Sequence, residues 1–237
     1  LTGSDSTRLQ PLTTIKPATG SNIRLINASD AYGVLKLSDV ILEGGNPSNS
    51  DPVENYGGII RSSASVNLDN VRIRAGQAVR GGAVFLSGRA GFVASDSEFQ
   101  GNQAGETGGA IAMNCYMDGS VARSVSVSRS SFRLNQAAAG AGAIQLCGNV
   151  AMTLQSSTLS QNSSAATSGA LHYSDGFGAS SVVLELDFVT AAENTGGPVI
   201  LSSGPYAWTL KKTVFAANTA GDCSVSGANP DCTAINP

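Results

Sequence analysis

Acidic side chains are the first candidates for chemistry in this chain of 237 residues. Hydrolysis of a glycosidic bond requires two carboxyl groups that face each other across a groove. Asp96 and Glu98 are two residues apart and share one face of a strand if this segment is extended, and Asp69 lies one repeat earlier at a similar position. The other acids are scattered, without the Asp-rich clustering of a calcium site. We interpret these three acids as a solvated face and expect no catalytic residue, cofactor or metal ligand.

Histidine, serine and lysine indicate a catalytic or binding site no more strongly than the acidic residues do. His172 is the only histidine, and we expect it to lie on the surface. Serine is frequent, but the G-x-S-x-G motif of a hydrolase nucleophile does not occur. Lys211-Lys212 is too short for a basic patch, and the formal net charge of −3 argues against binding to nucleic acid.

The four cysteines form an even set without CxxC spacing, which favours disulfides over a zinc site. Cys115 and Cys147 follow the glycine motifs of adjacent repeats at nearly the same distance, so we expect them to lie one above the other and to pair. The alternative is that both are reduced residues of the core. Cys223 and Cys232 then pair with each other. Disulfides persist in oxidising compartments, so the cysteines predict an extracellular location.

Two further features concern the environment of the chain. Asn27-Ala28-Ser29 and Asn162-Ser163-Ser164 match the acceptor sequence for N-glycans, which makes Asn27 and Asn162 candidate glycosylation sites. No apolar run approaches the about 18 residues that a membrane span requires. We therefore predict no membrane span in this chain.

An internal repeat positions all of these residues. One pattern recurs seven times: an apolar or small residue, a small or β-branched residue at +3, a bulky residue at +5, and Asn or Gly at +8. A motif of the type Gly-Gly-small-aliphatic follows each copy, as in Gly57-Gly58-Ile59-Ile60, Gly81-Gly82-Ala83-Val84 and Gly108-Gly109-Ala110-Ile111. The second position of this motif advances by 24, 27, 33, 27, 28 and 24 residues. The unequal steps indicate loops of variable length inserted into a constant coil.

Two solenoid folds share this spacing. A leucine-rich repeat needs a second, leucine-bearing segment, whereas here the second segment is followed by residues that alternate with period two, as in 126–128 and 181–186. No helical stripe of ten residues occurs. We therefore predict an all-β, single-domain parallel β-helix of about seven coils over residues 33–218. Residues 1–32 form an N-terminal cap or junction, and residues 219–237 form a disulfide-closed C-terminal cap.

Stacked coils repeat at about 4.8 Å, so equivalent positions lie directly above one another. The +5 positions predict an interior stack made of Leu42, Ile73, Phe99, Phe132, Leu159 and Phe215. The +8 positions predict an asparagine ladder at a bend, each amide bonding its neighbours, made of Asn102, Asn135, Asn162, Asn194 and Asn218.

The two motifs together resemble the polymorphic outer membrane protein repeat, known from chlamydial surface proteins. Its Gly-Gly-Ala-Ile half resembles the glycine motifs above, and its Phe-x-x-Asn half matches residues 99–102, 132–135 and 215–218. The resemblance covers roughly residues 33–223. It implies a right-handed β-helix at a cell surface that acts in adhesion or display. The first two coils depart from the family pattern, because Gly45 and Gly76 stand where the family has Asn.

The sequence thus predicts a structural or adhesive module at a cell surface or in an extracellular assembly. Its rigid side walls would face a protein or glycan partner, or copies of itself. The alternative is a carbohydrate-active enzyme on the same fold, either a polysaccharide lyase or a glycoside hydrolase. An enzyme should place acids from successive coils in one groove, whereas a scaffold should place small polar residues there.

Overall fold

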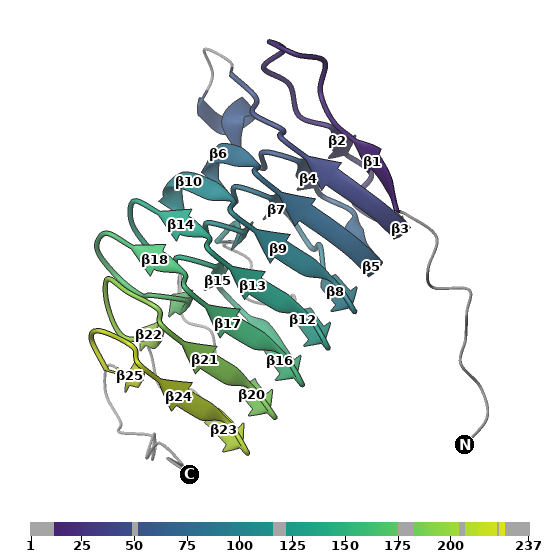
Figure 1. The fold of residues 1–237 in the computed structure, drawn as a ribbon. Coiled ribbons are helices and arrows are strands. Elements are labelled where there is room, and N and C mark those ends of the chain that lie inside the picture. The colour runs from purple at the N-terminus through teal and green to yellow at the C-terminus, as the bar shows by residue number, and fades with distance from the viewer. Residues whose placement is uncertain are drawn as a thin grey trace, which may run out of the picture.

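The computed structural model describes residues 12–48, 52–115, 122–174, 183–203, 207–221 and 223–225. Over these residues the chain winds into a parallel β-solenoid of about seven coils, which Figure 1 shows as a stack that runs from purple to yellow. The one helical element in the described part is a short 3-10 turn, η2 (Pro52–Asn55). The prediction of an all-β parallel solenoid is confirmed, and a leucine-rich repeat is excluded.

Three sheets run along the solenoid, and all of their strand pairs are parallel (Figure 1). The largest has thirteen strands in two rows that meet at a bend. The first row contains β3 (Val34–Glu43), β5 (Ser65–Arg74), β8 (Phe92–Ser95), β12 (Arg123–Ser128), β16 (Val150–Gln155), β20 (Val183–Asp187) and β23 (Ala207–Lys211). The second row contains β1 (Thr13–Ile15), β9 (Glu98–Gln100), β13 (Ser131–Arg133), β17 (Thr158–Ser160), β21 (Thr190–Ala192) and β24 (Val214–Ala216), and the long strands β3 and β5 continue across the bend into it.

The other two sheets complete each coil. The eight-stranded sheet contains β2 (Ile26–Ala28), β4 (Ile60–Ser62), β7 (Val84–Leu86), β11 (Ile111–Met113), β15 (Ile144–Cys147), β19 (Leu171–Ser174), β22 (Ile200–Ser203) and β25 (Cys223–Val225). The four-stranded sheet contains β6 (Gln77–Arg80), β10 (Gln103–Thr107), β14 (Gln136–Ala137) and β18 (Ser163–Ser164). Strands β1 and β2 come from the segment expected to be a cap, yet they pair with β3 and β4 and so extend the sheets.

The bend between the two rows is made by one residue per coil in the left-handed conformation. The φ angles of these residues lie between 47° and 54°, in a region that non-glycine residues seldom adopt. We call this set the bend column; it comprises Asp39, Asn70, Asp96, Arg129, Ser156, Phe188 and Lys212. A left-handed residue interrupts the period-two alternation of side chains, so facing cannot be counted across the bend by sequence spacing alone.

The interior is built from columns of equivalent residues. Cα pairing joins Leu42, Ile73, Phe99, Phe132 and Leu159 in series. The column then continues through Ala191 to Phe215, and all seven side chains are at most 4% exposed. The rings of Phe99 and Phe132 stack with their centres 4.5 Å apart and their planes 2° from parallel. The parallel register thus turns a sequence repeat into a continuous apolar core.

The glycine motif closes each coil tightly. At Gly109 a Cβ atom would lie 2.1 Å from the carbonyl oxygen of Gly142 in the next coil. No side chain fits such a distance, so glycine is required where neighbouring coils approach through their backbones.

An asparagine ladder runs beside the apolar column. Nδ2 of Asn135 donates to the carbonyl oxygen of Phe99 at 2.9 Å and to Oδ1 of Asn162 at 3.0 Å. Oδ1 of Asn135 accepts from the backbone N–H of Asn102 at 3.1 Å and from its Nδ2 at 2.9 Å. The same pattern continues through Asn194 to Asn218. Each amide therefore satisfies two buried backbone groups of the preceding coil and bonds the asparagine amide of the next.

The ladder also bears on the two candidate glycosylation sites. Asn162 is fully buried, and both protons of its amide are donated, to Phe132 and Asn194, so glycosylation at this position is incompatible with the fold. Asn27 is exposed and remains a candidate glycosylation site. In the second coil, Gly76 occupies the position where later coils have the ladder asparagine. A Cβ atom on Gly76 would lie 2.3 Å from the carbonyl oxygen of Gly82, which explains why asparagine is absent there.

A second polar ladder, made of serines, lies inside the bend. The hydroxyl of Ser130 accepts from the backbone N–H of Ser97 at 3.0 Å, and that of Ser157 accepts from the N–H of Ser130 at 3.1 Å. Each hydroxyl in turn donates to a carbonyl oxygen two residues earlier. The repeat pattern marked these positions as small, but it did not predict this bonding.

Cys115 and Cys147 form a disulfide with their Cα atoms 4.7 Å apart, which confirms the predicted pair. The buried guanidinium of Arg123 reinforces it, because Nη1 donates to the carbonyl oxygen of Asn114 at 2.9 Å and Nη2 donates to that of Cys147. Burial lowers the pKa of Arg123. The predicted pairing of Cys223 with Cys232 is not tested, because Cys232 lies outside the described residues.

Replacing both Cys115 and Cys147 by serine is expected to lower the free energy of unfolding by about 3 kcal/mol, because the disulfide closes a loop of 32 residues in the unfolded chain. Urea unfolding under non-reducing conditions measures the difference. Wild-type protein treated with a reductant should approach the variant. Equal stability of the variant and the untreated wild type would contradict the expectation.

Candidate functional site

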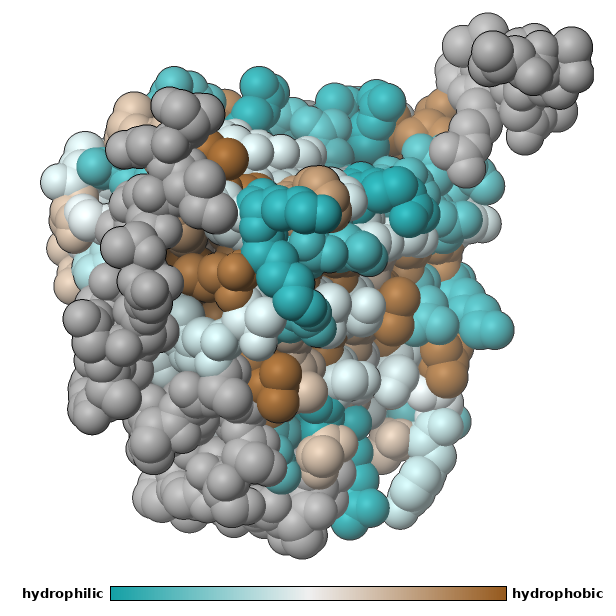
Figure 2. Space-filling view, turned by 90° about the horizontal axis from the view of Figure 1, so that it is seen from below, coloured by the Kyte–Doolittle hydropathy of each residue, from teal (hydrophilic) through white to brown (hydrophobic). Residues whose placement is uncertain are grey.

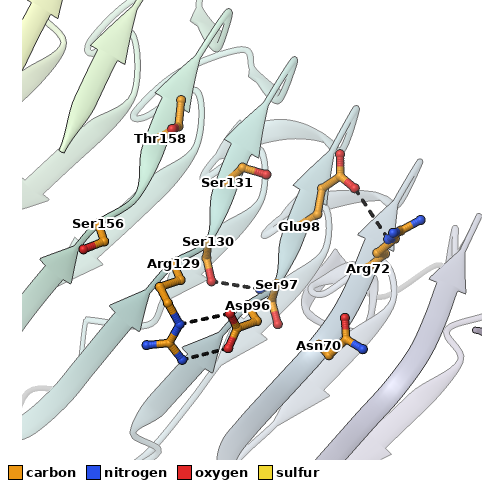
Figure 3. Close-up of a pocket in the computed structure, with 10 residues that line it drawn as sticks. All are labelled: Asn70, Arg72, Asp96, Ser97, Glu98, Arg129, Ser130, Ser131, Ser156 and Thr158. Carbon is orange, nitrogen blue, oxygen red and sulfur yellow. Dashed lines mark hydrogen bonds and ion pairs between the residues drawn. The ribbon is translucent and has the colours of Figure 1, made fainter. Parts of the chain in front are cut away.

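An open groove of about 520 Å³ follows the bend of the largest sheet across successive coils (Figure 3). We call it the bend groove. Its lining is polar throughout and comes from the bend column and the residues just after it: Asn70, Arg72, Asp96, Ser97, Glu98, Arg129, Ser130, Ser131, Ser156 and Thr158. The groove exists because the left-handed residues fold the outer surface of the sheet inward at the same place in every coil.

Two of the three acids singled out in the sequence reach this groove. Asp96 lies in the bend column and Glu98 begins β9, so the bend separates them although both line the groove. Asp69 does not line it. Its Cα pairs with Ser95, whose hydroxyl donates to Oδ1 of Asp69 at 2.8 Å. The prediction that Asp69 occupies a position similar to the other two acids was wrong, because the equivalent residue in that coil is Asn70.

Both acids of the groove are held by arginines from neighbouring coils. Arg129 donates from Nε and Nη2 to the two carboxylate oxygens of Asp96, at 2.9 and 2.7 Å, as Figure 3 shows. The hydrogen bond to Asp96 raises the pKa of Arg129. On the other side, Nε of Arg72 lies 3.9 Å from Oε2 of Glu98. Each arginine therefore links its own coil to the coil that carries the acid.

Charged and polar side chains elsewhere on the outer surface make similar links between coils. Arg74 pairs with Glu43 at 2.7 Å, and Lys211 pairs with Glu185 at 3.0 Å. The amide of Gln161 donates to Glu193 at 2.8 Å. Such exposed pairs contribute little stability individually. Their arrangement nevertheless shows that outward charges connect adjacent coils along the solenoid.

A second hollow, of about 300 Å³, lies on the eight-stranded sheet beside the disulfide. Its lining includes His172, Gln145 and Ser174. Nδ1 of His172 lies 3.0 Å from Oε1 of Gln145, so this ring nitrogen is the donor. The expectation of a surface histidine was wrong, since the side chain is half-buried and burial lowers its pKa from 6.5 to about 4.

The burial of His172 predicts a pH dependence of stability. Its folded-state pKa of about 4 lies below the ordinary histidine value of 6.5, so the unfolded chain binds the proton more tightly. The stabilisation is complete above pH 6.5 and is lost as the pH falls toward 4, by about 3 kcal/mol. Urea unfolding of wild type and His172→Gln between these pH values measures it. The free energy of unfolding of the variant should fall less than that of the wild type. Equal losses in the two proteins would contradict the assignment of this pH dependence to His172.

A third, shallower hollow of about 340 Å³ lies on the four-stranded sheet. Gln77, Gln103 and Gln136 form an exposed column in register, flanked by alanine and glycine. The lining of this hollow carries no charge.

Searches against protein-family models, curated proteins and solved structures found no match to this chain. Within the described ranges, no cluster of three or more His, Cys, Asp or Glu residues is arranged to hold a metal ion. No helix in the same ranges has the length and apolar character needed to cross a membrane.

Proposed function

We propose that this protein is a non-catalytic structural or adhesive module of the extracellular space or cell surface, which presents rigid side walls to a protein or glycan partner. The observation that carries the proposal is the arrangement of the outward charges. Arg129 holds Asp96, Arg74 holds Glu43 and Lys211 holds Glu185, each across a coil boundary. These side chains reinforce a surface instead of converging on a reacting bond.

The rigidity of the walls supports a display function. The apolar column, the asparagine ladder and the disulfide fix each coil to the next. A pre-formed surface loses little conformational entropy when it binds, so even a polar wall can hold a partner. On the face seen in Figure 2, hydrophobic areas are small and separated by polar ones, which suits a polar partner better than an apolar one.

The location is supported by two observations. The disulfide between Cys115 and Cys147 suits an oxidising compartment. The repeat also resembles that of polymorphic outer membrane proteins, and the parallel solenoid which that resemblance implies is the fold observed.

Incubation with immobilised cell-surface and extracellular-matrix preparations tests the proposal. We expect saturable retention of the folded protein on a protein or glycan component, with no change in that component. Loss of retention after thermal unfolding serves as the control. Absence of retention on every preparation would contradict an adhesive function.

A carbohydrate-active enzyme is the second candidate, favoured by the presence of Asp96 and Glu98 in one groove. Assays for new reducing ends and for unsaturated products on a panel of polysaccharides separate the two functions. Cleavage that disappears in Asp96→Asn or Glu98→Gln would establish the enzyme and overturn the proposal of a non-catalytic module.

A further inference from the structure

We propose that the bend groove binds a neutral oligosaccharide that lies along the solenoid axis, with the ring of Phe188 as an apolar platform at one end. This inference rests on the proposed adhesive function and names its ligand class. Four features of the groove support it: balanced charge, available hydrogen-bonding groups, an exposed aromatic ring and the regular spacing of the coils.

The charges of the groove favour a neutral ligand. Arg72 and Arg129 supply two positive charges, and Asp96 and Glu98 supply two negative charges. An anionic sugar beside Arg72 or Arg129 would also meet the carboxylates of Glu98 and Asp96 in the coil between them, and a cationic one would meet the arginines. A neutral chain avoids both penalties and can use each ion pair as a source of donors and acceptors.

Several groups of the lining remain available to sugar hydroxyls. The side-chain hydroxyls of Ser131, Ser156 and Thr158 make no hydrogen bond within the described part of the chain, and each of the three residues is at least partly exposed. Arg129 uses Nε and Nη2 for Asp96, and 60% of its side chain is exposed, which leaves Nη1 toward solvent. Hydroxyl and guanidinium groups held in fixed positions suit the vicinal hydroxyls of a sugar ring.

Phe188 lies in the bend column, one coil beyond the residues that line the groove. The backbone N–H of Ser156 donates to the carbonyl oxygen of Asp187 at 2.9 Å, so Phe188 follows Ser156 in the bend column. Its side chain is 52% exposed, and Lys212 Nζ lies 4.3 Å from the ring centre. Solvent exposure and a φ of 54° both disfavour phenylalanine here, and an exposed contact with Lys212 is only a weak reason for an aromatic residue. The apolar C–H face of a sugar ring packs on an aromatic ring, which supplies a reason.

The coil spacing fits an extended oligosaccharide. Equivalent side chains recur about every 4.8 Å along the axis, close to the length of one sugar residue in an extended chain. A ligand along the axis therefore meets a similar polar surface at each sugar and reaches Phe188 at its end.

Binding to a panel of immobilised hexasaccharides tests the proposal. The neutral members are β-linked glucose, mannose and N-acetylglucosamine oligomers, and the acidic member is a uronic-acid oligomer. We expect wild type to bind at least one neutral member in preference to the acidic one. Phe188→Ala should weaken this binding about tenfold, and Thr158→Arg, which fills the groove, should abolish it. Circular dichroism of each variant verifies the fold.

Leu134→Ala is the matched control. Leu134 is also an exposed hydrophobic residue with a positive φ, 57°, but it does not line the bend groove, so binding should be unchanged. Preference for the acidic member, or neutral binding that survives both groove variants, would overturn the inference. Retention on surface preparations without binding to any neutral hexasaccharide would overturn the inference and leave the adhesive function standing. Failure of both kinds of binding would overturn both.

Discussion

Replacing Asn135 by alanine is expected to lower the free energy of unfolding by about 4 kcal/mol. Asn135 lies in the middle of the ladder and is fully buried. Its loss leaves the backbone N–H of Asn102, one proton of the Asn102 amide and the carbonyl oxygen of Phe99 without this side chain as a partner. Buried polar groups that lose a partner cost far more than an exposed hydrogen bond contributes, so the effect should be severe.

Urea unfolding, followed by far-ultraviolet circular dichroism, measures this loss. Gln136→Ala is the control, because Gln136 is the next residue in the chain, carries a similar amide and is exposed. We expect that control to remain within about 0.5 kcal/mol of wild type. A small effect at Asn135 would mean that water or rearranged side chains replace the amide, and that the ladder does not hold the coils together.

Replacing Phe132 by alanine is expected to lower the free energy of unfolding by about 4 kcal/mol. The side chain is completely buried between Phe99 and Leu159 in the apolar column, and its ring stacks on that of Phe99. Alanine leaves a cavity in the middle of the solenoid. Neighbouring coils cannot collapse into it without breaking the strand pairing on either side.

Phe132→Leu distinguishes the cost of a cavity from a general sensitivity of β13 to substitution. Leucine already occupies the same column at Leu159, so this substitution should cost less than about 1.5 kcal/mol. The comparison uses urea midpoints of the two variants and wild type. Equal losses in both variants would show that ring stacking, and not filled volume, stabilises the column.

Much of the fold was determined by the sequence alone, because a parallel solenoid converts a repeat along the chain into a column in space. The positions of Phe99, Phe132 and Asn135 in the repeat were sufficient to predict the apolar stack and the asparagine ladder. The pairing of Cys115 with Cys147 followed from the same reasoning, since both residues follow glycine motifs of adjacent coils at nearly equal distances. Inward-facing side chains are constrained by packing and hydrogen bonding in every coil, and so they leave a repeated pattern.

Only the tertiary structure determined the arrangement of the outer surface and the positions of the residues that the repeat pattern predicted wrongly. The left-handed residue at the bend places Asn70, and not Asp69, beside Asp96, because it interrupts the alternation on which sequence counting depends. His172 was expected at the surface, and Asn162 was a candidate glycosylation site as well as a ladder residue, but neighbouring coils bury the first partly and the second fully. Outward side chains vary from coil to coil, and the partners of the charged ones that link coils lie 26 to 33 residues away across loops of unequal length. Such contacts leave no periodic pattern, so the bend groove becomes apparent only when the coils are stacked.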